Sequence, residues 1–478
     1  MGALENKAKN GLLWSSIDKF STLIIQFLVG IILARLLMPE DFGLIGMITI
    51  LLAISQCLIN GGFYTALVQK KDIDNKDYST IFFFNIGVAF CLYLILYWSS
   101  NYISRFYEEP MLVDLVKVIA INIVILSTTI VHRAILAREI DFKTQAIAHI
   151  TSSVIAGIIG IYLAIAGYGV WALVFQYLSR SILVALLYWV LNRWTPAFVF
   201  SKKSFQSLFS FGSKLMISEL LKVFFKNLYI IIIGKIYKAE ELGYFTRAEL
   251  FKQVPGTLVG NILQGVTFPL MVKVIDDDKK VENVLVRSIK LTAFILFPVI
   301  LWLLFFSKPL ILVLLTEKWL PSVIFLQILS LDIIFQPIQY INLNFLNAKG
   351  RSDLFLKLEM AKNVLTVIAI LITYKYGLLH MCIGYVAVSC ISFFINSHYT
   401  GKFIGYTSLK QLVDLMPYAL GGTIAVSISY FICVFIPTEL MQLLFGTILC
   451  VLLYLLVSKI MKFRELNDMK SILVSKFN

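Results

Sequence analysis

The chain consists of long apolar runs that are separated by short polar stretches. A helix that crosses a bilayer needs about 20 mainly apolar residues, and runs of this length recur along the whole sequence. We therefore predict an all-α polytopic membrane protein with about 14 transmembrane helices. The predicted spans are residues 12–36, 43–68, 80–103, 112–135, 146–166, 169–191, 209–235, 246–272, 288–306, 320–346, 354–375, 378–400, 412–436 and 440–461.

Several of these apolar segments carry polar residues at helical spacing. In the first span, Asp18, Thr22 and Gln26 follow one another at intervals of four residues, which places them on one face of a helix. Later spans carry further charges and amides, namely Arg180 in 169–191, Glu249, Lys252 and Gln253 in 246–272, Asp332 and Gln336 in 320–346, and Lys362 in 354–375.

The densest set of charges lies in the apolar segment 209–235. Glu219, Lys222 and Lys226 share one face of the predicted helix. An ionised side chain at the centre of a bilayer costs about 2.5–3.5 kcal/mol even on lenient insertion scales. We therefore expect this face to meet water, ions or a polar ligand.

The same region repeats the beginning of the chain. Gly11-Leu-Leu-Trp-Ser opens the first span and Met38-Pro-Glu-Asp-Phe-Gly-Leu44 follows it, while Gly212-Ser-Lys-Leu-Met and Lys238-Ala-Glu-Glu-Leu-Gly-Tyr244 take the matching places about 200 residues later. This pattern predicts two six-helix lobes that are related by a parallel repeat. The predicted domains are residues 1–200, residues 201–408, and a C-terminal helix pair with a cytoplasmic tail at 409–478.

Composition and charge agree with a membrane protein. Hydrophobic residues make up 59% of the chain and charged residues only 15%, against about 25% in a typical soluble protein. If the N-terminus lies inside the cell, 25 of the Lys and Arg residues between spans fall on the cytoplasmic side and 8 on the outer side. By the positive-inside rule, both termini and the linker 192–208 should be cytoplasmic. The net charge of +14 therefore does not indicate nucleic-acid binding.

Charges inside the spans indicate a polar cavity that is rich in cations. Arg and Lys are the usual ligands of phosphate, which favours an anionic substrate. The candidate substrate-binding cations are Lys19, Arg180, Lys222, Lys226, Lys252 and Lys362; the candidate ion-coupling carboxylates are Asp18, Glu219, Glu249 and Asp332; and Gln26, Gln253 and Gln336 are candidate lining residues. The alternative is that the polar stripes only join helices and that Asp18 and Glu219 are structural ion-pair partners.

Asp18 and Glu219 occupy matching positions in the two repeats, so Asp18 is the first choice as coupling group, with Lys19 as its expected partner. His149, at the start of a span, is expected to pack or to form hydrogen bonds. Neither cysteines nor histidines form a metal-binding pattern, so no cofactor is expected beyond a coupling proton or sodium ion.

The chain lacks the common catalytic motifs GxSxG, HExxH and Walker A, and the predicted outer loops are short. These observations argue against an enzyme, including a membrane polysaccharide polymerase or ligase. A multidrug cation antiporter is the other alternative, but its cavity should be dominated by carboxylates rather than by Lys and Arg.

The opening Gly11-Leu-Leu-Trp-Ser15, the later Leu33-Ala-Arg-Leu-Leu-Met-Pro-Glu-Asp-Phe-Gly43, the repeat and the span count resemble the polysaccharide-flippase branch of the multidrug/oligosaccharidyl-lipid/polysaccharide exporter superfamily. The resemblance covers essentially the whole chain and includes Wzx-type flippases. It implies two six-helix lobes around a cationic cavity, alternating access, and coupling to a proton or sodium gradient.

The resemblance also implies a substrate and a place of action. The substrate would be an undecaprenyl-pyrophosphate-linked oligosaccharide, moved from the cytoplasmic to the outer leaflet of a bacterial inner membrane. Such a protein would work as a monomer among membrane lipids, with a polysaccharide polymerase and a chain-length regulator as partners. The resemblance assigns no individual cavity residue.

Overall fold

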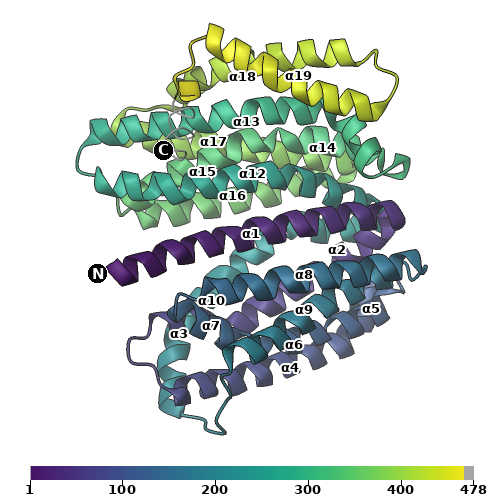
Figure 1. Cartoon of the computed structure of the whole chain (residues 1–478), viewed down its shortest axis with the longest axis vertical. Helices are drawn as coiled ribbons and strands as arrows, with labels where there is room; N and C mark the ends of the chain where they lie inside the picture. The colour runs from purple at the N-terminus through teal and green to yellow at the C-terminus, as the bar shows by residue number, and fades with distance from the viewer. Residues whose placement is uncertain (1, 468–478) are drawn as a thin grey trace. The chain divides into compact units, whose positions relative to one another are not determined.

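The computed structural model describes residues 2–467, and within that range it describes all side chains except those of residues 2–6, 8, 258, 259 and 261–266. Every regular element in the described part of the chain is helical (Figure 1). The chain divides into two compact units, one ending at Gly243 and the other beginning at Tyr244. The domain boundaries predicted at residues 200 and 408 stay predictions.

The first unit is built from α1 to α11 and the first turn of α12. The α1 helix packs along α8, and α8 packs along α9, as Figure 1 shows. The bounds are α1 Gly2–Leu36, α2 Pro39–Asn60, α3 Phe63–Gln69, α4 Asn75–Tyr107, α5 Leu112–Ile119, α6 Ile121–Ser127, α7 Ile130–Arg138, α8 Phe142–Ile165, α9 Val170–Asn192, α10 Lys202–Lys226 and α11 Leu228–Ile236.

Local sequence explains where these helices begin. Pro39 opens α2, because its fixed φ suits the first turn and its missing N–H has no partner there anyway. The Asp74 carboxylate accepts a hydrogen bond from the backbone N–H of Asp77 (2.9 Å) and so caps α4. Lys70 pairs with Asp77 at 2.6 Å and secures the same turn.

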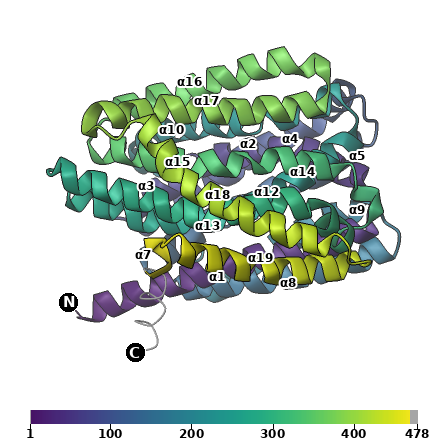
Figure 2. The same cartoon turned by 90° about the horizontal axis from the view of Figure 1, so that it is seen from above.

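The second unit contains α12 to α19 and two short 3₁₀ turns. In it, α16 and α17 run side by side, and α18 packs against both α13 and α19 (Figure 2). The bounds are α12 Ala239–Lys273, α13 Asp278–Leu314, η1 Glu317–Trp319, α14 Ser322–Ser330, α15 Asp332–Ala348, α16 Ser352–Thr373, η2 Tyr374–Tyr376, α17 Leu378–Ile404, α18 Ser408–Cys433 and α19 Glu439–Ile460.

The N-terminus of α13 is capped by a carboxylate outside the membrane span. The backbone N–H groups of Lys279 and Lys280 both donate to Asp277 Oδ1 at 3.1 Å. The hydrogen bond from the Lys280 N–H, followed by the one from its ammonium group, lowers the pKa of the Asp277 carboxyl. An ionised Asp277 therefore stabilises the start of the helix, where the helix dipole favours negative charge.

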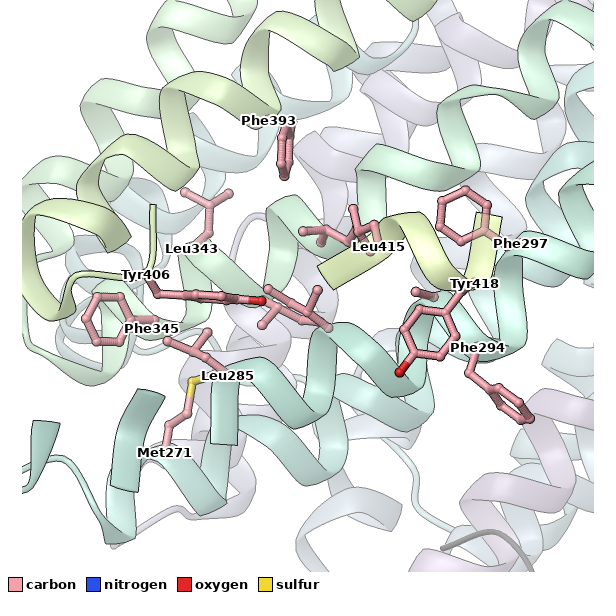
Figure 3. Close-up of a cluster of buried hydrophobic side chains, with 14 of the residues drawn as sticks. Met271, Leu285, Phe294, Phe297, Leu343, Phe345, Phe393, Tyr406, Leu415 and Tyr418 are labelled. Atoms are coloured by element: carbon pink, nitrogen blue, oxygen red, sulfur yellow. The ribbon is translucent and has the colours of Figure 1, made fainter. Parts of the chain in front are cut away.

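One large hydrophobic core holds the second unit together. Met271 and Leu285 lie at one end of the close-up in Figure 3, and Phe294 and Tyr418 lie at the other. Phe345 and Phe393 of the same core are completely buried. These side chains come from α12, α13, α15, α17 and α18, and the same core also includes Leu358 of α16 and Tyr454 of α19.

Eleven helices of the described residues are long and apolar enough to cross a membrane. They correspond to eleven of the predicted spans. The segment predicted as one helix over 209–235 is instead α10 and α11 with a break at Asn227, whose amide donates to the Val223 carbonyl at 2.8 Å. This segment, α12 and α16 are not among the eleven. The count of 14 thus stays a prediction.

The repeated motifs at the starts of α2 and α12 touch each other. A Cβ atom at Gly43 would overlap the carbonyl oxygen of Ala239, and a Cβ atom at Gly243 would overlap that of Pro39. Gly43 and Gly243 are the matched glycines of the two motifs, and Pro39 and Ala239 are matched as well. Glycine is needed at both positions because the two backbones approach too closely for any side chain.

Candidate functional site

The polar stripe on α1 faces partners on α8 and α9. Asp18 lies opposite His149 of α8, with Oδ2 at 2.9 Å and Oδ1 at 3.2 Å from Nδ1. Thr22, one turn after Asp18, donates its hydroxyl to Asp18 Oδ1 at 3.2 Å. The Asp18 side chain is 18% exposed, so this carboxylate is only partly shielded.

The other nitrogen of His149 is also engaged. The Tyr188 hydroxyl, on α9, lies 2.9 Å from His149 Nε2, and Tyr188 itself is completely buried. The three side chains therefore form a chain of hydrogen bonds that runs from Asp18 into the interior of the unit. Such a chain can accept or pass on a proton.

The stripe continues at Gln26, one turn beyond Thr22. With its amide oxygen turned toward α9, Gln26 accepts a hydrogen bond from Arg180 Nη2 at 2.8 Å. Lys19, the expected partner of Asp18, is exposed instead. The structure thus pairs Asp18 with an imidazole rather than with an ammonium group.

The charged face of α10 is open. Glu219 and Lys222 are 55% and 72% exposed, and the Lys222 ammonium lies 3.5 Å from a Glu219 oxygen. Lys226 is exposed as well, and it is the last residue of α10 before the break at Asn227. The structure therefore leaves two cations and one carboxylate of α10 uncovered by the rest of the described chain.

A second cluster of charges lies buried in the second unit. The Lys252 ammonium, on α12, lies 3.1 Å from Asp332 Oδ2 of α15 and 3.9 Å from Glu249 Oε1. It also donates to the Tyr385 hydroxyl of α17 at 3.3 Å and lies 4.4 Å from the centre of that ring. Lys252 is only 2% exposed, so an anionic ligand cannot reach it in this conformation.

The remaining predicted residues are less tightly held. Gln253 donates to Glu249 Oε1 at 3.1 Å and extends the cluster toward solvent. Gln336 is partly buried near Gly256. Lys362 is partly buried, and its ammonium makes no ion pair within residues 2–467 that joins it to either cluster.

Sequence reasoning did not single out Tyr188 and Tyr385, and it named His149 without assigning it to a site. His149 was expected to pack or to form hydrogen bonds, and Tyr188 and Tyr385 carried no signal beyond an aromatic residue in an apolar run. Each contributes through a contact between helices that are distant in sequence. Only the ionisable character of His149 marked it in advance.

An apolar cavity of about 500 Å³ lies between α13 and α19 in the second unit. Its walls include Phe294, Trp302 and Tyr454, with Pro298 and Cys450 between them. Nearly all of its lining is hydrocarbon, so it fits an apolar chain rather than a sugar. Among the described residues, no group of three or more His, Cys, Asp or Glu side chains could hold a metal ion.

Comparisons with known proteins identify the family. A family model described as "Polysaccharide biosynthesis protein" matches residues 32–324, more than half of the chain. The teichuronic acid biosynthesis protein TuaB of Bacillus subtilis (strain 168) is 30% identical over 83% of each chain. The succinoglycan biosynthesis transport protein ExoT of Rhizobium meliloti (strain 1021) is 25% identical over 64% of this chain and 62% of its own.

A solved structure shows the same fold. The lipid II flippase MurJ, in its inward closed conformation, is similar with a TM-score of 0.78, at 18% identity over 94% of this chain and 98% of its own. These relationships support a multi-pass membrane transport protein for polysaccharide biosynthesis, and not an enzyme. The chain therefore belongs to the polysaccharide biosynthesis protein family, within the polysaccharide-flippase branch of the exporter superfamily that its sequence resembles.

Proposed function

We propose that the protein is a flippase for lipid-linked oligosaccharides. It moves an undecaprenyl-pyrophosphate-linked repeat unit from the cytoplasmic to the outer leaflet by alternating access, and an ion gradient drives it. The glycan serves a cell-surface polysaccharide such as O-antigen, capsule or exopolysaccharide. Family membership supports the class of substrate, and the names of TuaB and ExoT support polysaccharide biosynthesis.

The observation that carries the proposal is the open cationic end of α10. Lys222 and Lys226 lie on α10, in a segment that the sequence predicts to span the membrane, yet both are exposed. The neighbouring carboxylate of Glu219 limits the repulsion between the two ammonium groups. A pyrophosphate needs cationic groups to replace its water, and Lys supplies such charge without fixed geometry. The apolar cavity between α13 and α19, within the second unit, has a lining that suits a polyprenyl chain.

Surface glycan in a deletion strain tests this anion site. Lys226→Ala should abolish complementation while leaving normal amounts of protein in the membrane, and Lys226→Arg should retain part of it because the charge survives. Lys143→Ala is a matched control, since Lys143 lies at a helix end over the Trp14 ring rather than on α10. Full activity of Lys226→Ala would place the anion site elsewhere.

The carboxylates Asp18, Glu219, Glu249 and Asp332 are the proposed coupling groups, with a proton or a sodium ion as the coupling ion. The alternative substrate is an organic cation, as in multidrug antiporters. In the described conformation, Asp18, Glu249 and Asp332 already contact His149 or Lys252, which disfavours a cation-binding cavity. Transport of a cationic dye by the purified protein, with no effect on glycan, would favour that alternative.

We propose that the protein works as a monomer in a bacterial inner membrane, beside a polysaccharide polymerase and a chain-length regulator. Both termini and the linker 192–208 are placed in the cytoplasm by the positive-inside rule. Alkaline phosphatase fused after Lys203 should then be inactive, and fused after Lys238 it should be active. The reverse pattern would contradict this topology.

A further inference from the structure

The pair formed by Asp18 and His149 has the geometry of a shared proton. Both Asp18 oxygens lie within 3.2 Å of Nδ1, so this nitrogen carries a hydrogen that points at the carboxylate. The Tyr188 hydroxyl lies 2.9 Å from Nε2, where it can donate to a neutral ring or accept from a charged one. These distances fit a neutral imidazole beside an ionised carboxylate, a pair to which one further proton can be added.

The same oxygens make a poor site for sodium. Hard cations prefer several oxygen ligands, and among the described side chains the Thr22 hydroxyl is the one that donates a hydrogen bond to the Asp18 carboxylate. The His149 ring lies against both Asp18 oxygens, where a sodium ion held by the two oxygens would sit. A sodium ion would have to displace the ring and break the hydrogen bond to Tyr188.

The surrounding charges also distinguish the two ions. Tyr188 interacts electrostatically with Arg133 on α7, Tyr64 on α3 and Asp18 on α1, and Arg180 on α9 interacts with Asp18 and with Tyr177. The two arginines raise the electrostatic free energy of any added cation. A proton overcomes this by forming a covalent N–H or O–H bond, whereas sodium depends on electrostatic attraction alone.

We propose that Asp18 and His149 hold the coupling proton jointly, and that His149 makes this site selective for protons over sodium. When a proton arrives, His149 carries hydrogens on both nitrogens, Nε2 donates to the Tyr188 oxygen, and the Tyr188 hydroxyl turns its own hydrogen away. The proposal rests on the proposed function, because it names the ion that drives the transporter.

The first test needs neither substrate nor transport. The chain contains only four histidines, so a spectrum of protein labelled with ¹⁵N in the histidine rings is simple to assign with His149→Gln. We expect the Nδ1–H tautomer at His149 in wild type and a tautomer ratio changed about tenfold or more in Asp18→Asn, because a hydrogen bond to a charged group is lost. An unchanged ratio would overturn the proposal.

Wild-type protein supplies a second readout in case the variants fold poorly. Replacing potassium by sodium should leave the His149 signals in place and release no protons. Signals that move with sodium, or protons released by it, would show a metal site at Asp18 and overturn the proposal.

Transport in proteoliposomes is the third test. An imposed pH gradient should change the rate of wild type but not of His149→Gln, and a sodium gradient should change neither. His132→Gln is the control, since His132 lies in the same unit and contacts the Asn192 amide instead of a carboxylate. A His149→Gln rate that follows the pH gradient, or a wild-type rate that follows sodium, would overturn the proposal. If wild type moves no lipid-linked oligosaccharide, the proposed function fails, and the spectra still decide the proton site.

Discussion

The two charge clusters of this protein use carboxylates in different ways. In the first unit, Asp18 is partly exposed and faces an imidazole. In the second unit, Asp332 is buried and faces the ammonium group of Lys252. An ammonium group stays charged at physiological pH, whereas the charge of an imidazole changes there. Of the proposed coupling carboxylates, Asp332 is therefore the less favourable in this conformation, because it faces a permanent cation, and Asp18 is the more favourable.

Burial strengthens this difference. Lys252 has one carboxylate at 3.1 Å, a second at 3.9 Å and an aromatic ring at 4.4 Å, all inside the unit. Removing one partner from such a cluster leaves an uncompensated charge in a medium of low dielectric constant. The cluster around Asp18 keeps access to water, so the loss of one partner there can be compensated by hydration.

The largest expected effect follows from Lys252. Lys252→Met should lower the free energy of unfolding by about 3–5 kcal/mol, because Asp332 stays buried without its cation. Thermal or chemical unfolding in mixed micelles would measure it. Lys362→Met, which removes a partly buried lysine without breaking a cluster, is the control.

A double variant separates the effect of the unpaired charge from the effect of lost packing around Lys252. The double change Lys252→Met with Asp332→Leu removes both charges and should recover most of the lost stability. If Lys252→Met alone is as stable as wild type, the ion pair does not lock the second unit, and Lys252 is free to serve as the substrate ligand predicted from its sequence position.

Asp18 should show a smaller effect on stability and a larger one on coupling. Asp18→Asn keeps a hydrogen-bonding side chain beside His149, so we expect a loss of about 1 kcal/mol. A double-mutant cycle with His149→Gln measures the interaction directly. A coupling free energy as large as that between Lys252 and Asp332 would contradict the distinction between Asp18 and Asp332.

The stripes themselves were predictable, but their partners were not. Spacing placed Asp18, Thr22 and Gln26 on one face of a helix, and the structure confirms a continuous stripe on α1. The partners His149 and Arg180 belong to helices more than 100 residues away, and no local pattern specifies that contact. Lys19 was the obvious partner by sequence, yet adjacent residues of a helix point in different directions.

The fold shows the same limit. Long apolar runs predicted the eleven candidate spans because burial in lipid demands them. The break at Asn227 was not predicted, since the apolar pattern continues across it; there the Asn227 side-chain amide donates to the Val223 carbonyl. The repeat did not predict the close contact between Gly43 and Ala239, because it gives matching positions in the sequence but no distance between them in space.

The exposed charges on α10 can be compared with the clusters around Asp18 and Asp332, and their removal should affect stability still less. Lys222→Ala should change the free energy of unfolding by less than about 0.5 kcal/mol, because an exposed side chain loses little when it is removed. Its effect on surface glycan should nevertheless be large if this face binds the substrate. Equal losses of folded protein and of glycan would show that Lys222 is structural.

The smallest effect is expected at the exposed pair of Glu108 and Lys235, which joins the end of α4 to α11 within the first unit. The Lys235 ammonium lies 2.8 Å from Glu108 Oε1, yet the Glu108 side chain is 79% exposed. The hydrogen bond from Lys235, then its charge, lowers the pKa of the Glu108 carboxyl from its ordinary value of 4.5. Since the folded state favours the ionised carboxylate, any stabilisation is present above the pKa of the unfolded chain and disappears as the pH falls through the lowered value.

Water screens a pair as exposed as this one, so Glu108→Gln should leave the unfolding transition unchanged at neutral pH. A carboxyl titration followed by NMR should still show a midpoint for Glu108 below 4.5, and Lys235→Met should return it toward that value. The two measurements together separate the presence of an ion pair from its effect on stability. A clear loss of stability in Glu108→Gln would mean that solvent exposure does not determine how much each charge pair contributes to stability. The contrast between Asp18 and Asp332 would then need another cause.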